Sequence, residues 1–130
     1  MIVIDASVIL NLILPGVTNS YIHERVFSSG KTLHAPQLLD LEIIQVIGRY
    51  LRKNDLTKTR AQQAFDDFRN LSISRHHHAT LINRIWQLRN ALTSYDAAYL
   101  ALAEGLDARL LTCDTGLAAV AQGSVQTELL

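Results

Sequence analysis

The sequence predicts an α/β fold in which helices cover both faces of a parallel sheet. Short apolar segments of strand character alternate along the chain with longer segments of helical periodicity. One helical segment, residues 94–105, leaves almost no polar face, as expected for a helix buried against a sheet. The 130 residues include only two prolines and six glycines and show no linker or repeat, so we expect one domain, residues 1–130.

The first half of the chain is predicted to begin with a strand and then to alternate helices with further strands. Proline fits the first turn of a helix and glycine fits its end, so these residues set several boundaries. We expect strands at residues 2–4, 32–35 and 71–74, and helices at residues 7–14, 19–29, 36–53 and 57–70. Pro15 and Gly16 end the first of these helices, and Gly30 ends the second.

The second half is predicted to contain the most buried helix and the last two strands. It begins with a polar turn at His76, His77 and His78. We then expect a helix to about Asn90, the apolar helix at residues 94–105, a leucine-rich strand at 109–113, a short helix at 114–121 and a strand at 124–127.

Composition excludes several classes of protein. Twelve lysines and arginines balance twelve aspartates and glutamates, so bulk positive charge alone cannot bind nucleic acid, although a local basic patch can. A single cysteine, Cys113, cannot form an internal disulfide. The start has no basic signal segment, and the longest uncharged stretch, residues 6–22, is interrupted by Asn, Pro and Gly. We therefore expect a cytoplasmic protein without a membrane partner.

Four carboxylates occupy positions next to predicted strands or apolar helix faces, where an ordinary solvent-exposed side chain is not expected. Asp5 and Asp114 each follow a predicted strand, and the carboxyl ends of parallel strands are where α/β proteins place ligands. Asp96 lies in the first turn of the apolar helix, and Glu42 borders the apolar stripe of its helix. The alternatives are helix capping for the three aspartates and an ordinary surface position for Glu42.

These four side chains form a coherent set only if a cation lies between them. Like charges in one pocket repel one another, and oxygen ligands suit Mg²⁺ or Mn²⁺ rather than a structural zinc ion. A carboxylate cluster that holds a divalent metal can activate water and neutralise a phosphodiester, as nucleases do. The sequence has no phosphate-binding glycine loop, dinucleotide turn, zinc-protease helix or serine-hydrolase elbow.

At these residues the chain resembles the PIN-domain family, and within it the VapC-type ribonuclease toxins of toxin–antitoxin pairs. The resemblance covers nearly the whole chain and rests on four stretches: residues 2–8 with Asp5, 35–39 with Glu42, 94–103 with Asp96, and 110–114 with Asp114. It implies a three-layer α/β/α sandwich with a mostly parallel five-stranded sheet. It also implies that Asp5 and Asp96 are the central Mg²⁺ ligands, that Glu42 and Asp114 complete the pocket, and that Ser7 and Thr112 lie near the metal or the phosphate.

The resemblance further implies a biological setting. The expected protein is a Mg²⁺-dependent endoribonuclease that leaves 3′-hydroxyl and 5′-phosphate ends on tRNA, rRNA or mRNA. It would form a homodimer and would bind a cognate antitoxin of the VapB type. Two alternatives remain open at this stage: a receiver-like Mg²⁺-binding signalling domain, disfavoured because no lysine follows Lys58, and an inactive RNA-binding or protein-binding module on the same fold.

Further residues are candidates for contacts with RNA. Arg84 and Arg89 precede the apolar helix and could reach a phosphate, unless they form surface ion pairs. A basic patch that could follow an RNA backbone, or could simply be a solvated helix end, comprises Arg49, Arg52, Lys53, Lys58 and Arg60. The helical spacing of Trp86, Tyr95 and Tyr99 predicts that all three pack in the core, and Cys113 is expected there as well.

Overall fold

The computed structural model describes residues 1–14, 20–28 and 30–130 and contains a parallel sheet of five strands. The strands are β1 (Ile2–Ile4), β2 (Leu33–Pro36), β3 (Ile73–His76), β4 (Arg109–Thr112) and β5 (Thr127–Leu129). Their order across the sheet is β3-β2-β1-β4-β5, and every neighbouring pair is parallel. The predicted fold class is therefore confirmed, with a sheet that is parallel throughout.

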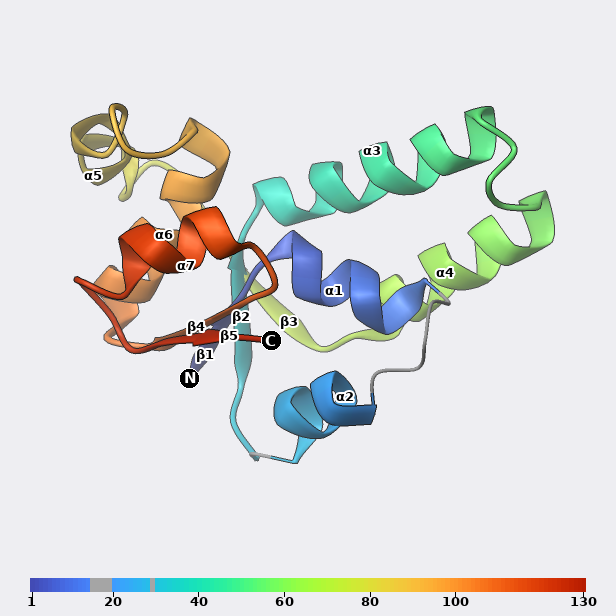
Figure 1. The fold of residues 1–130 in the computed structure, drawn as a ribbon, viewed down its shortest axis with the longest axis horizontal. Helices are drawn as coiled ribbons and strands as arrows, with labels where there is room; N and C mark the ends of the chain where they lie inside the picture. The colour runs from blue at the N-terminus through green and yellow to red at the C-terminus, as the bar shows by residue number, and fades with distance from the viewer. Residues whose placement is uncertain (15–19, 29) are drawn as a thin grey trace.

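Helices cover both faces of this sheet. They are α1 (Ala6–Ile13), α2 (Ser20–Phe27), α3 (Leu38–Arg52), α4 (Lys58–Asn70), α5 (Ile82–Gln87), α6 (Ser94–Leu106) and α7 (Thr115–Ala121). The chain builds outward from β1 to β2 and β3, then returns past β1 to β4 and β5. Because crossovers between parallel strands are right-handed, this reversal puts α1 to α4 on one face and α5 to α7 on the other, as Figure 1 shows.

The core lies where β1 and β4 meet the central helices. All three residues of β1 are buried, and α6 is buried continuously from Ala97 to Ala103, as its apolar sequence predicts. Tyr99 is only 1% exposed and is a core residue, in agreement with the sequence. The same expectation is wrong for Trp86 and Tyr95, which are 67% and 63% exposed.

The misplaced aromatic residues have a structural reason. Trp86 lies on α5, a helix of six residues that has no buried member, and Tyr95 lies in the exposed first turn of α6. Helical spacing predicts that side chains share a face, but it does not predict that the face meets the sheet. The helix expected to reach Asn90 ends at Gln87 because a tighter turn begins at Leu88.

Other boundaries differ by one to three residues from those predicted. His76 belongs to β3, where it pairs with Pro36, so the expected polar turn begins one residue later. β5 begins at Thr127 rather than at Ser124. Asp114 precedes α7 as its cap. The expected helix stop at Pro15 and Gly16, the start at Asn19 and the end at Ser29 lie outside the described residues.

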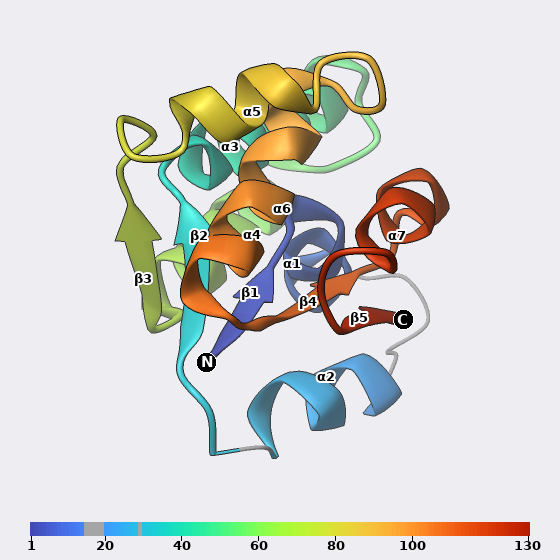
Figure 2. The ribbon, with the colours of Figure 1, turned by 90° about the vertical axis from the view of Figure 1, so that its left-hand side faces the viewer.

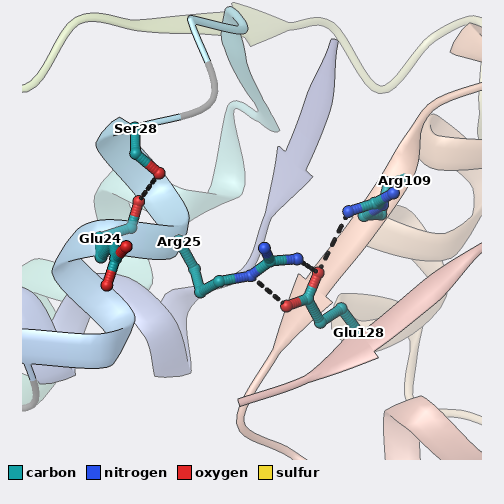
Figure 3. A network of polar contacts seen from close by, with 5 residues as sticks. All are labelled: Glu24, Arg25, Ser28, Arg109 and Glu128. Atoms are coloured by element: carbon teal, nitrogen blue, oxygen red, sulfur yellow. Dashed lines mark hydrogen bonds and ion pairs between the residues drawn. The ribbon is translucent and has the colours of Figure 1, made fainter.

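Ion pairs attach α2 to the far edge of the sheet. Glu128 of β5 accepts hydrogen bonds from Nε and Nη2 of Arg25, each at 2.5 Å, and a third from Arg109 of β4 at 3.2 Å. Figure 3 shows this network, together with the hydrogen bond from the Ser28 hydroxyl to the Glu24 carbonyl.

Among the described residues, none of the helices has both the length and the apolar composition that a membrane span requires.

Candidate metal-dependent active site

The four predicted carboxylates gather near the point where the direction of chain progression across the sheet reverses. β1 and β4 are neighbours in the sheet although about a hundred residues separate them, and the connections leave them on opposite faces. In parallel α/β sheets, ligands bind beyond the carboxyl ends of strands at such a point. Asp5 directly follows β1, and Asp114 lies two residues beyond the end of β4. In Figure 2, β1 and β3 point toward the side of the molecule on which α5 and the start of α6 lie.

Asp5 is a buried carboxylate with three hydrogen-bond donors. It is 5% exposed, and its Oδ1 accepts from the Ser7 hydroxyl at 2.6 Å and from the Val8 N–H at 3.2 Å. Its Oδ2 accepts from the Thr112 hydroxyl at 2.6 Å. Burial raises the pKa of Asp5, while these hydrogen bonds act in the opposite direction. A carboxylate has about four lone-pair positions, so Asp5 keeps about one for a further ligand.

The two hydroxyls are oriented by the chain just after β4. The Ser7 oxygen accepts the Cys113 N–H at 2.8 Å, and the Thr112 oxygen accepts the Asp114 N–H at 2.9 Å. Because each oxygen is already an acceptor for a backbone N–H, its own proton is free to point at Asp5. Ser7 and Thr112 therefore position Asp5 and join the ends of the two strands, whereas the sequence indicated only that they lie near the metal or phosphate.

Asp114 combines the two roles that the sequence left open. Its side chain caps α7 by accepting the Leu117 N–H at 2.9 Å, yet the residue stays exposed to solvent. Its charge also raises the pKa of Asp5 and of Asp96, after the larger effect of burial. A capping aspartate thus contributes negative charge to the same pocket.

Glu42 and Asp96 come from helices that begin at this edge of the sheet. The Tyr99 hydroxyl donates to Glu42 Oε1 at 2.9 Å and joins α6 to α3. Burial raises the pKa of Glu42 and of Asp96, and Asp96 and Asp5 raise that of Glu42 further. Thr93 caps α6 by accepting the Asp96 N–H at 3.2 Å, which fixes the backbone that carries Asp96.

The resulting pocket has an excess of negative charge. Electrostatic repulsion links Asp5 with Asp114, Asp96 with Asp114, and Glu42 with both Asp5 and Asp96. No lysine or arginine of the described residues contributes to these shifts. Such a set is stabilised by a cation, and its donors are the oxygen ligands that Mg²⁺ prefers.

The carboxylates do not form a complete ligand shell for a metal ion. Within the described residues, no three His, Cys, Asp or Glu side chains are arranged as a ready-made metal site. Mg²⁺ commonly keeps several waters and binds through one or two carboxylates together with substrate phosphates. A cation in this pocket would therefore keep water or substrate oxygens among its ligands.

The predicted basic residues lie away from this pocket or have partners. Arg84 forms an ion pair with Glu104, at 2.6 and 2.9 Å, on the later turns of α6. Arg60 donates to the Ile13 carbonyl at 2.6 Å. Arg49, Arg52, Lys53 and Lys58 are exposed at the α3–α4 end, where Arg49 and Arg52 lie about 10–15 Å from Glu42 along the axis of α3. Arg89 stacks on Trp86 beside the start of α6.

Two residues near the site were not predicted as contributors. Tyr99 was expected only in the core, but its hydroxyl positions Glu42. A tyrosine on a buried helix needs a hydrogen-bond partner, and that requirement was the available signal. His78 accepts the Leu38 N–H at 3.2 Å through Nε2, and so caps α3 where Gln37 provides no side-chain cap. Nothing in local sequence connects positions forty residues apart.

Comparisons with known proteins show what this chain is similar to. A family model described as the PIN domain matches residues 2–123. Ribonuclease VapC9 of Mycobacterium tuberculosis is 34% identical over 122 residues, covering 94% of this chain and 92% of that protein. Ribonuclease VapC12 of the same organism is 33% identical over 130 residues, covering 100% and 99%. The crystal structure of FitAcB from Neisseria gonorrhoeae shares the fold, with a TM-score of 0.73, 15% identity, and coverage of 98% and 96%.

Proposed function

This chain belongs to the PIN-domain family and to the VapC ribonucleases within it, and from that premise we propose how its acidic pocket hydrolyses RNA. It is an endoribonuclease of the kind that forms the toxin of a toxin–antitoxin pair. The observation that supports the site is the convergence of Asp5, Glu42, Asp96 and Asp114 without an opposing cationic side chain among the described residues. Such a pocket is suited to a divalent metal and a phosphodiester.

We propose Mg²⁺ as the cofactor, with Mn²⁺ as a substitute. Asp5 and Asp96 would be its central ligands, and Glu42 and Asp114 would complete the pocket through direct contacts or bound water. When bound, a divalent cation lowers the pKa of a water molecule and offsets the charge that develops on the phosphate.

The protein groups have separable tasks in this scheme. Ser7 and Thr112 hold the Asp5 carboxylate in one orientation through short hydrogen bonds. The Tyr99 hydroxyl holds Glu42 in the same way. Its fixed carboxylate makes Glu42 our candidate for the group that orients the attacking water and accepts its proton.

The remaining partners follow from family membership. We propose an RNA substrate whose backbone the exposed residues Arg49, Arg52, Lys53 and Lys58 attract from a distance. We also propose a VapB-type antitoxin, a homodimer and a cytoplasmic location. Exposed apolar side chains of α3, Leu41 at 72% and Ile44 at 49%, provide surface that a protein partner would cover. Light scattering of the purified chain, alone and with the antitoxin, tests both assemblies.

The alternatives have little support. The matching family model is that of a nuclease domain and not of a receiver domain. An inactive binding module on the same fold predicts no cleavage in the experiment below.

Cleavage of purified cellular RNA tests the proposal directly. The antitoxin-free protein is incubated with Mg²⁺ or Mn²⁺, with EDTA, and as an Asp96→Asn variant. The exposed Asp67→Asn variant on α4 is the matched control, because it makes the same change outside the pocket. We expect metal-dependent cleavage by the wild type and by Asp67→Asn, and none by Asp96→Asn. Equal cleavage by Asp96→Asn, or cleavage unaffected by EDTA, would contradict the site assignment.

A further inference from the structure

An exposed tryptophan on α5 borders a cavity that reaches the start of α6 and has no role in the scheme above. Trp86 is the only tryptophan of the chain and is 67% exposed on α5. It borders a cavity of about 380 Å³ whose lining residues are Ile82, Ile85, Trp86, Arg89, Leu92, Thr93 and Ser94. The cavity therefore extends from Trp86 to the first residues of α6, two positions before Asp96.

A guanidinium covers one face of the indole. The Arg89 guanidinium lies 4.4 Å from the ring centroid, within the range of a cation–π contact, and its Nη1 donates to the Trp86 carbonyl at 2.9 Å. This pair fixes both side chains with respect to α5. The exposed fraction of Trp86 leaves apolar ring surface facing solvent, where another flat group can stack.

The charge of the cavity favours a phosphate-bearing ligand. Arg89 has no carboxylate partner among the described residues, in contrast to Arg84 five residues earlier, which is paired with Glu104. No aspartate or glutamate lines the cavity. An exposed aromatic ring beside an unpaired guanidinium is the combination with which proteins bind single-stranded nucleic acid: the ring stacks on a base and the cation contacts the backbone.

We propose that Trp86 and Arg89 form a binding subsite for one unpaired nucleotide of the RNA substrate. Its base stacks on the open face of Trp86, and its phosphate contacts Arg89. The inference rests on the proposed ribonuclease function and deepens it, because it restricts the substrate to RNA that contains at least one unpaired nucleotide. Base-paired RNA cannot present a free base face to the indole.

Intrinsic fluorescence tests this subsite without any turnover. The Asp96→Asn protein, which we expect to be inactive, is titrated with a pool of random-sequence single-stranded RNA, and emission of the sole tryptophan reports stacking on Trp86. We expect quenching by single-stranded RNA and much weaker quenching by a fully paired duplex or by an oligonucleotide that lacks bases. Absence of quenching by the random pool overturns the proposal.

Variants separate the base contact from the phosphate contact. In fluorescence anisotropy with labelled RNA, we expect Trp86→Ala to weaken binding about 5- to 100-fold and Trp86→Phe to restore most of it. Arg89→Ala should weaken binding and reduce the salt dependence by about one counterion, whereas Arg89→Lys should preserve that dependence. Tyr21→Ala, an exposed aromatic of α2, is the matched control and should bind as the parent protein does.

The outcomes distinguish this proposal from the ribonuclease proposal and from a protein contact. If the wild-type protein cleaves RNA but Trp86→Ala does not weaken RNA binding, the subsite proposal is wrong and the ribonuclease assignment stands. If Trp86→Ala changes the oligomeric state in sedimentation and leaves RNA affinity unchanged, the indole is part of an interface between protein chains, and the proposal is likewise wrong. Thermal melts verify that each variant is folded.

Discussion

Asp5 is the residue at which burial and charge oppose each other most directly. Burial raises its pKa in spite of three hydrogen bonds that favour the ionised form. For an acid whose pKa is higher in the folded state, this group favours folding at low pH, and that contribution is lost as the pH rises through the raised pKa. Above that pKa, the desolvated ionised carboxylate therefore lowers the free energy of unfolding of the metal-free protein.

This sign leads to a prediction for Asp5→Asn. Without metal, at pH values above the raised pKa of Asp5, we expect the variant to be more stable than the wild type and to have no nuclease activity. The gain should shrink as the pH falls toward the ordinary pKa of an aspartate. Thermal melts over this pH range measure the effect, with Asp67→Asn as the control. A less stable Asp5→Asn protein would show that the hydrogen bonds of the carboxylate outweigh its desolvation.

The acidic residues could be predicted from sequence, whereas their supporting contacts could not. Asp5 and Asp114 follow short apolar strands, so their position at one sheet edge follows from the parallel topology. The hydrogen bond from Tyr99 to Glu42 joins residues 57 positions apart on two helices, which no local pattern encodes. Trp86 was placed in the core because its spacing matches that of apolar neighbours, although α5 presents it to solvent.

At the scale of elements, the strands and long helices were predictable and the short connecting elements were not. β1 and α6 consist almost entirely of apolar residues, and such composition is compatible only with a buried element. α5 has six residues and no buried member, so neither its length nor its exposed face is determined by its own sequence. The late start of β5 reflects its pairing with β4, a tertiary interaction.

The C-terminal end of α6 provides a prediction about helix stability. Asp107 caps this helix in the left-handed region, at φ 48° and ψ 45°, and carries a negative charge at the negative end of the helix dipole. We expect Asp107→Gly to raise the free energy of unfolding by about 0.5–1 kcal/mol without affecting RNA cleavage. Asp107→Asn removes the charge alone and should give a smaller gain. Chemical denaturation measures both, and an unchanged midpoint for Asp107→Gly would contradict the conformational argument.

The attachment of α2 to the sheet provides a prediction about pH. Arg25, and to a smaller extent Arg109, hold the pKa of Glu128 below its ordinary value. For an acid with a lowered pKa, the stabilisation is present above the ordinary pKa and is lost as the pH falls through the lowered one. We expect Glu128→Gln to lower the Tm by a few degrees at pH 7, and the difference to disappear in acid.

The control for this ion pair is Glu24→Gln. Glu24 lies on the same helix and is exposed, so the change removes one negative charge without removing the contact to Arg25 seen in Figure 3. A constant difference between Glu128→Gln and wild type across the pH range would mean that the stabilisation does not depend on ionised Glu128.

In the molecule as a whole, the topology brings the acidic residues together but brings no positive side chain to balance their charge among the described residues. Strands are added to one side of β1 first and to its other side afterwards. This change of side at β1 and β4 brings carboxylates from residues 5 to 114 to one edge of the sheet. Burial raises the pKa of Asp5, Glu42 and Asp96 most, and the mutual repulsion of the carboxylates raises it further. This repulsion therefore lowers the stability of the metal-free folded state, and a bound cation relieves it. Metal binding and global stability should consequently be coupled.

This coupling predicts that divalent metal stabilises the fold. A ligand that binds only the folded state at about 100 times its Kd contributes about 2.7 kcal/mol, so saturating Mg²⁺ or Mn²⁺ should raise the Tm by several degrees, and EDTA should reverse the change. The shift should be strongly reduced in Asp5→Asn and Asp96→Asn and retained in Asp67→Asn. Thermal melts across a metal titration measure it independently of any nuclease activity. An equal shift in Asp5→Asn, Asp96→Asn and wild type would place the metal outside the acidic pocket and would contradict the assignment of its ligands.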